Sequence, residues 1–109
     1  MMKELVMKLI GEARIQRAVA MSHLDNGIHV FAYPLDASML IAMGVSAEAP
    51  MRPEDLLRRR GAELETFGGW LPALFNDGGM YVIRRLSSEE EDGGDELDRQ
   101  LEAALELLN

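Results

Sequence analysis

Residues 68–86, with the sequence GGWLPALFNDGGMYVIRRL, decide how the rest of the chain can fold. Two apolar runs with aromatic side chains flank Asn76, Asp77, Gly78 and Gly79, residue types that accept the backbone angles of tight turns at low steric cost. This pattern predicts a β-hairpin. Because one helix is predicted before it and another after it, we expect the hairpin to form the surface on which both helices pack.

The composition fits one small domain, and we expect a cytoplasmic location. The chain has 109 residues and no cysteine, which rules out disulfides, thiolate metal sites and cysteine nucleophiles. No apolar run approaches the roughly 20 residues needed to cross a bilayer. Residues 1–10 interleave charges with apolar side chains, unlike a signal peptide. We therefore expect residues 1–109 to form a single domain without membrane insertion.

The net charge of −8 comes from the C-terminal part of the chain. Residues 1–86 contain ten acidic and ten basic side chains, whereas residues 87–109 contain nine acidic side chains and one basic one. The strongest basic cluster, residues 58–60, follows Glu54 and Asp55 by one turn of a predicted helix, so we interpret it as a solvated helix face. Nucleic-acid-binding proteins normally present a basic surface, and none is predicted here.

The N-terminal segment begins with a helix. Apolar side chains recur at steps of three and four over residues 2–10, and Gly11 can end this helix in a left-handed turn. Residues 12–24 fit either a helix or a strand. We favour a strand ending near His23, because extending the helix would bring polar side chains to its buried side.

A strand meander follows in the first half of the chain. Residues 25–27 (Asp-Asn-Gly) are a strong turn signal, and residues 28–33 form a β-rich run after it. Residues 39–45 are almost continuously apolar, which is typical of a strand buried on both faces. The first half is therefore predicted to contain two or three antiparallel strands.

The second half alternates helices with the hairpin. Residues 53–65 form a predicted helix with Pro53 in its first turn. Residues 87–95 form a flexible acidic loop without apolar side chains, and residues 96–108 form an amphipathic C-terminal helix. The predicted fold class is therefore α+β, an antiparallel sheet of meander plus hairpin with three helices in the order α-β-β-β-α-β-β-α.

The sequence contains no recognisable catalytic, metal or cofactor site. His23 and His29 are the only histidines, and no third ligand has suitable spacing, so we expect no metal site. The serines lie outside any nucleophile-elbow context, and the glycines form no phosphate-binding or dinucleotide-binding pattern. We expect no enzyme activity and no cofactor.

Methionine is the most informative residue type. The chain has eight methionines, and flexible thioethers suit surfaces that accommodate varied apolar partners. Ordinary core filling explains each of them equally well.

The order of predicted elements resembles that of the class I effector chaperones of bacterial type III secretion systems. The similarity is clearest over residues 39–108, from the apolar strand through the helix, the Gly68-Gly69 break and the hairpin to the terminal helix with Leu97 and Leu101. It implies a homodimer, or sometimes a heterodimer, without catalytic activity. Such a protein binds an extended segment of a secreted effector protein and keeps it export-competent.

The resemblance also assigns residues to two surfaces. The dimer interface it implies would contain Leu56, Leu57, Trp70, Leu71 and Leu74. The effector-binding surface it implies would contain Leu5, Val6, Leu9, Val30 and Phe31. The alternative function is that of a small acidic α+β adaptor or regulatory module, whose acidic C-terminal part docks on a basic partner.

Overall fold

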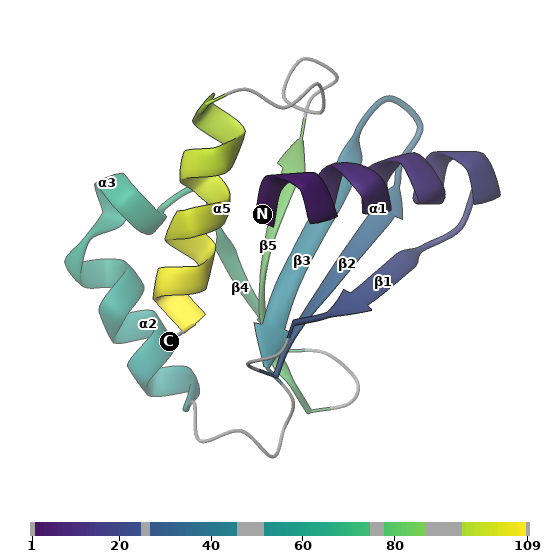
Figure 1. The fold of residues 1–109 in the computed structure, drawn as a ribbon. Helices are drawn as coiled ribbons and strands as arrows, with labels where there is room; N and C mark the ends of the chain where they lie inside the picture. The colour runs from purple at the N-terminus through teal and green to yellow at the C-terminus, as the bar shows by residue number, and fades with distance from the viewer. Residues whose placement is uncertain (1, 25–26, 46–51, 75–77, 87–94, 109) are drawn as a thin grey trace.

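The computed structural model describes residues 2–24, 27–45, 52–74, 78–86 and 95–108 and shows an α+β fold (Figure 1). The elements in chain order are α1 (Met2–Gln16), β1 (Ala20–His23), β2 (Ile28–Pro34), β3 (Met39–Val45), α2 (Pro53–Ala62), α3 (Leu64–Phe67), β4 (Leu71–Leu74), β5 (Met80–Leu86) and α5 (Asp95–Leu108). The predicted fold class and the alternation of helices and strands are confirmed.

The five strands form one antiparallel sheet in the order β1-β2-β3-β5-β4. Both predicted hairpins, β1 with β2 and β4 with β5, are present, so β1 and β4 become the two edges. Gly27 and Gly78, one between each pair of strands, have φ angles of 84° and 81°, in the left-handed region that favours glycine. The predicted turn residues 25–26 and 76–77 and the predicted loop residues 87–94 lie outside the described residues.

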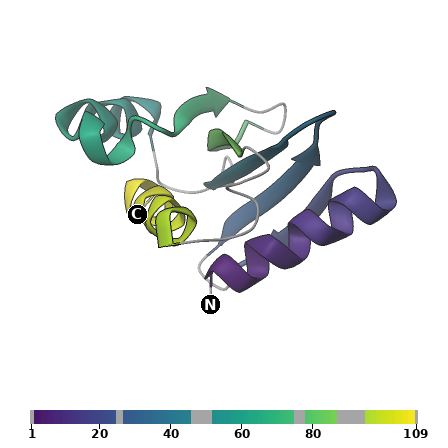
Figure 2. The ribbon, with the colours of Figure 1, turned by 90° about the horizontal axis from the view of Figure 1, so that it is seen from above.

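Helices α1 and α5 lie on one side of the sheet, and α2 and α3 lie beside α5 near the β4 edge (Figures 1 and 2). The register aligns Val30, Met43 and Val82 across β2, β3 and β5, and all three side chains are fully buried. Val6 of α1 and Leu101 of α5 belong to the same core cluster. The core is therefore a layer between two helices and one face of the sheet.

The first helix is longer than predicted. It does not end at Gly11 but continues to Gln16, because Ala13 extends the buried stripe of Val6 and Ile10 by one further turn. Arg17, with a φ angle of 54°, then ends the helix, so both polar residues at its end remain exposed. The strand favoured for residues 12–24 is therefore wrong for residues 12–16, which are helical, and is correct only for β1, which ends at His23 as predicted.

The middle helix is divided into two, which raises the helix count from the predicted three to four in the described residues. Glu63, with φ −139° and ψ 61°, interrupts the segment predicted as one helix and separates α2 from α3. Gly68 then follows Phe67, which is buried, so the short α3 anchors the chain to the core just before β4.

Replacing Gly11 by alanine should stabilise the protein by about 1 kcal/mol, because Gly11 lies inside α1 and nothing lies within 4 Å of an added Cβ. Urea denaturation followed by circular dichroism measures this change. A loss of stability would mean that α1 ends at Gly11.

Gly44→Ala provides the matched contrast. Its added methyl group would collide with the Tyr81 ring and the Met80 carbonyl oxygen across β3 and β5, so we expect a loss of about 1–3 kcal/mol.

Candidate functional site

The side of the sheet opposite α1 and α5 carries a continuous apolar row. Strand pairing aligns one side chain from each of the five strands, in the order Met21, Phe31, Ala42, Ile83 and Leu71. Side chains alternate along a strand, so this row points away from the face on which the neighbouring core residues are buried. We call these five residues the apolar row.

Among the described residues, no helix packs over the apolar row (Figure 2). Met21 and Leu71, at its two ends, are 53% and 55% exposed, Phe31 and Ile83 are partly buried, and Ala42 at its centre is fully buried. An apolar row across a sheet without a covering layer is unusual for an isolated chain, because apolar surface of this kind is normally buried against a partner.

Aromatic contacts hold the centre of this surface in place. The Phe31 ring lies 5.6 Å from the Tyr81 ring and 6.0 Å from the Tyr33 ring, centroid to centroid. Gly44, opposite Tyr81 in the register, has no side chain, which leaves room for the Tyr81 ring over the sheet. The surface beside β2 is thus built from packed rings.

The two edges of the sheet differ in their capacity for strand pairing. Strand β4 contains Pro72, which lies opposite Val82 and has no backbone N–H. Proline is tolerated in an edge strand where its missing N–H would point outward, so the outer edge of β4 lacks a donor. Strand β1 contains no proline and keeps its outward donors. An added strand therefore fits β1 better than β4.

The residues that the resemblance assigned to effector binding are mostly in the core. Val6, Leu9 and Val30 are buried between α1 and the sheet, because the apolar stripe of α1 packs on β1 and β2. Leu5 is partly buried beside this core. Phe31 alone of the five lies in the apolar row.

The residues assigned to the dimer interface divide into two groups. Leu56 and Trp70 are fully buried within the chain, whereas Leu57, Leu71 and Leu74 are 54%, 55% and 69% exposed. Leu56 and Leu57 differ because adjacent positions on a helix point about 100° apart. We call Leu57, Leu71 and Leu74 the leucine surface; Leu71 and Leu74 are three positions apart on β4, so they lie on opposite sides of the strand and a partner must contact both sides of the β4 edge.

Trp70 connects the hairpin to both neighbouring helices. Its indole Nε1–H donates to the Gln100 carbonyl oxygen of α5 at 2.8 Å. The Nε–H of Arg60 on α2 donates to the Trp70 carbonyl oxygen, also at 2.8 Å. Both helices are therefore hydrogen-bonded to Trp70, which lies just before β4. The expectation that both pack on the hairpin itself is met only in part, because α5 contacts the sheet mainly at β3.

The prediction of a solvated face at residues 58–60 is correct only for Arg58, which pairs with Asp55 at 3.6 Å on the surface. Arg59 donates through Nη1 to the Leu107 carbonyl oxygen at the end of α5, where a cation also interacts favourably with the helix dipole. Arg59 and Arg60 follow the buried Leu56 by three and four residues, so they share its face. That spacing was the signal available in the sequence.

The methionines are divided between core and surface. Met39, Met43 and Met80 are buried, whereas Met7 and Met21 are exposed. Three of the five methionines whose side-chain burial is described therefore fill the core, and Met21 contributes to the apolar row.

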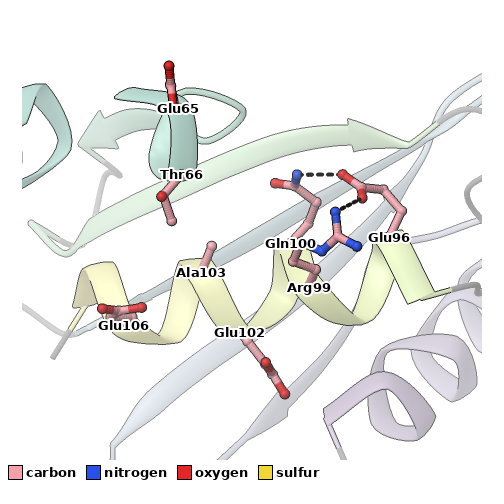
Figure 3. A pocket seen from close by; sticks show the side chains of 8 residues that line it. All are labelled: Glu65, Thr66, Glu96, Arg99, Gln100, Glu102, Ala103 and Glu106. Atoms are coloured by element: carbon pink, nitrogen blue, oxygen red, sulfur yellow. Dashed lines mark hydrogen bonds and ion pairs between the residues drawn. The ribbon is translucent and has the colours of Figure 1, made fainter. Parts of the chain in front are cut away.

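A cavity of about 320 Å³ lies between α3 and α5 (Figure 3). The residues that line it are mainly charged or polar: Glu65, Thr66, Glu96, Arg99, Gln100, Glu102, Ala103 and Glu106. Glu96 accepts hydrogen bonds from Arg99 and Gln100, both at 2.9 Å, while Figure 3 shows the Glu65 and Glu102 carboxylates pointing in different directions. The lining groups do not converge on one point as catalytic groups must.

Within the described ranges, no group of three or more His, Asp or Glu side chains could hold a metal ion. None of the helices that the structure describes has the length and hydropathy of a membrane span.

In comparisons with known proteins, neither a protein-family model nor a curated protein matches this chain. Its surfaces are therefore the basis for assigning a function.

Removing the Arg59 guanidinium should destabilise the fold. We expect Arg59→Ala to lower the free energy of unfolding by about 1–2 kcal/mol, because it leaves the end of α5 without its half-buried donor. The matched variant Arg58→Ala removes only a surface ion pair and should change stability by less than about 0.5 kcal/mol. Urea denaturation measures both, and equal effects would contradict this role of Arg59.

Proposed function

We propose that this protein is a non-catalytic, cytoplasmic chaperone that binds an extended segment of a secreted effector protein and keeps it export-competent. The observation that carries the proposal is the apolar row, which runs across all five strands and is exposed at both ends. The order of elements, which resembles that of the class I type III secretion chaperones, supports the same function.

An extended segment has a physical reason to bind at β1. Its main chain would pair with the free donors and acceptors of this edge. Every second side chain of the segment would then point to the same face as Met21, and the one opposite Met21 would extend the apolar row by one position. Main-chain pairing tolerates many sequences and the apolar row selects apolar side chains, a combination suited to a partner that is held unfolded.

The leucine surface is the proposed dimer interface, and a second copy of this chain is its proposed occupant. Contact at the β4 edge must depend on side chains, because Pro72 interrupts main-chain pairing there. Leu57, Leu71 and Leu74 provide exposed apolar side chains on α2 and β4. Leu56 and Trp70 contribute indirectly, by fixing α2 and the start of β4 to the core.

The alternative is an acidic adaptor or regulatory module that docks on a basic partner. The cavity between α3 and α5 favours it, since four carboxylates, Glu65, Glu96, Glu102 and Glu106, line this cavity with one guanidinium. Such a contact would be electrostatic and therefore sensitive to salt.

Leu71→Glu and Leu74→Glu should each weaken self-association at least about tenfold, since each buries a charge in the proposed interface. Sedimentation velocity over a concentration series measures the effect. The control is Ile15→Glu, which changes an 85% exposed side chain on α1 and should leave association unchanged. A wild-type protein that sediments only as a monomer would contradict the dimer.

Met21→Glu should weaken binding of extended effector segments about tenfold or more, because it places a charge at the exposed end of the apolar row. Fluorescence anisotropy with a panel of segments from type III effectors measures this, and Met7→Glu on α1 is the matched control. Hydrogen exchange of the bound state should show protection of β1 amides. Protection confined to β4 would contradict the proposed edge.

The same titrations at low and high salt separate the two functions. Affinity that changes little with salt supports apolar binding at β1. A steep loss of affinity at high salt supports the acidic module.

A further inference from the structure

Two imidazole rings lie in contact on the open side of the sheet. His23 of β1 and His29 of β2 are directly opposite in the register. Their ring centroids are 4.4 Å apart, with an interplanar angle of 86°. They are the only two histidines of the chain, so pairing of β1 with β2 is what brings them together.

The same cross-strand row continues from His29 through Gly44 to Tyr81. Because Gly44 has no side chain, the Tyr81 hydroxyl reaches to 3.4 Å from Nδ1 of His29. When Nδ1–H donates to the Tyr81 oxygen, the Nε2 atom of His29 keeps its lone pair. A second hydrogen bond of this kind commonly orients a metal-binding histidine.

His23 provides the adaptable half of the pair. It lies on an edge strand and its side chain is exposed, so the ring can rotate without displacing core residues. His29 is only half-buried and is held by the contact with Tyr81. The His29 ring is thus held in one orientation, and the His23 ring can turn so that both face a shared ion.

We propose that His23 and His29 form a bidentate site for a divalent late transition-metal ion, with water completing its coordination. Neutral imidazole nitrogen suits Cu²⁺, Ni²⁺ and Zn²⁺, with Zn–N distances of about 2.0–2.1 Å. The ring centroids are 4.4 Å apart, so rotation of the exposed His23 side chain can bring one of its nitrogens toward an ion bound at Nε2 of His29. Mg²⁺ and Ca²⁺ require oxygen ligands and do not fit this pair.

The affinity order follows from the ligand chemistry. Cu²⁺ should bind most tightly, and Ni²⁺ and Zn²⁺ more weakly. Since the site supplies two protein ligands, it leaves positions open on the metal for water or for a group from another molecule. The site uses the imidazole side chains of His23 and His29, and its test needs neither a dimer nor an effector segment.

Isothermal titration of the tag-free protein with Cu²⁺, Ni²⁺ or Zn²⁺ alone tests the site. Wild-type protein should bind one ion per chain. His23→Ala and His29→Ala should each weaken binding at least about tenfold, because each destroys the chelate. Electron paramagnetic resonance of the Cu²⁺ form should show coupling to two nitrogens in the wild type and to one in each variant.

Metal binding by carboxylates must be measured separately from binding by the two imidazoles. The chain has 19 Asp and Glu residues, so the double variant His23→Ala, His29→Ala gives the binding that does not depend on imidazole. His29→Gln, with circular dichroism as a check of folding, guards against a structural effect of alanine at this position. Metal should also raise the thermal midpoint of the wild type and not that of His29→Gln.

Two results would overturn the proposal. One is an affinity that is the same in the wild type and the double variant, which means carboxylate binding alone. The other is a stoichiometry of two that falls to one in each single variant without a change in affinity, which means that the imidazoles bind separately.

Discussion

Side-chain alternation is the constraint on which the rest of this structure depends. Each strand directs every second side chain toward α1 and α5, and it must direct the others to the opposite side, which no described helix covers. The side chains on the covered face form the core, as the complete burial of Val30, Met43 and Val82 shows. The apolar row and the histidine pair both belong to the opposite face, so both candidate binding features follow from covering one face of a sheet with helices.

The contacts of Trp70 determine where the remaining helices lie. The residue is fully buried. Its indole N–H donates a hydrogen bond to α5, and its carbonyl oxygen accepts one from α2. Arg59 adds a second connection from α2 to the end of α5. These bonds keep α2 and α3 beside the β4 edge instead of over the sheet. Leu57 therefore remains outside, and the open face remains open.

Most of the fold could be predicted because its decisive signals are local. The turns at Gly27 and Gly78, the apolar strand β3 and the regular stripe of α5 each depend on residues close in sequence. The end of α1 could not be predicted, because it depends on Arg17 in a left-handed conformation that non-glycine residues rarely adopt.

The surfaces were harder to predict than the fold, because they depend on contacts between distant segments. Leu56 and Leu57 are chemically identical neighbours, and only the way in which α2 packs on the rest of the chain decides which is buried. The apolar row joins residues from 21 to 83 along the chain, and it exists only once the register of all five strands is set. A pattern within one strand contains no information about that alignment.

Pro72 has a consequence for the size of any assembly. A sheet with two pairing-competent edges can join head to tail, β1 of one chain against β4 of the next, and such a contact repeats without limit into a filament. The missing donor at Pro72 blocks this route at one end. Growth by strand pairing is then terminated after a single addition at β1. Because of this one proline, the protein can accept a foreign strand at β1 and still remain a particle of finite size.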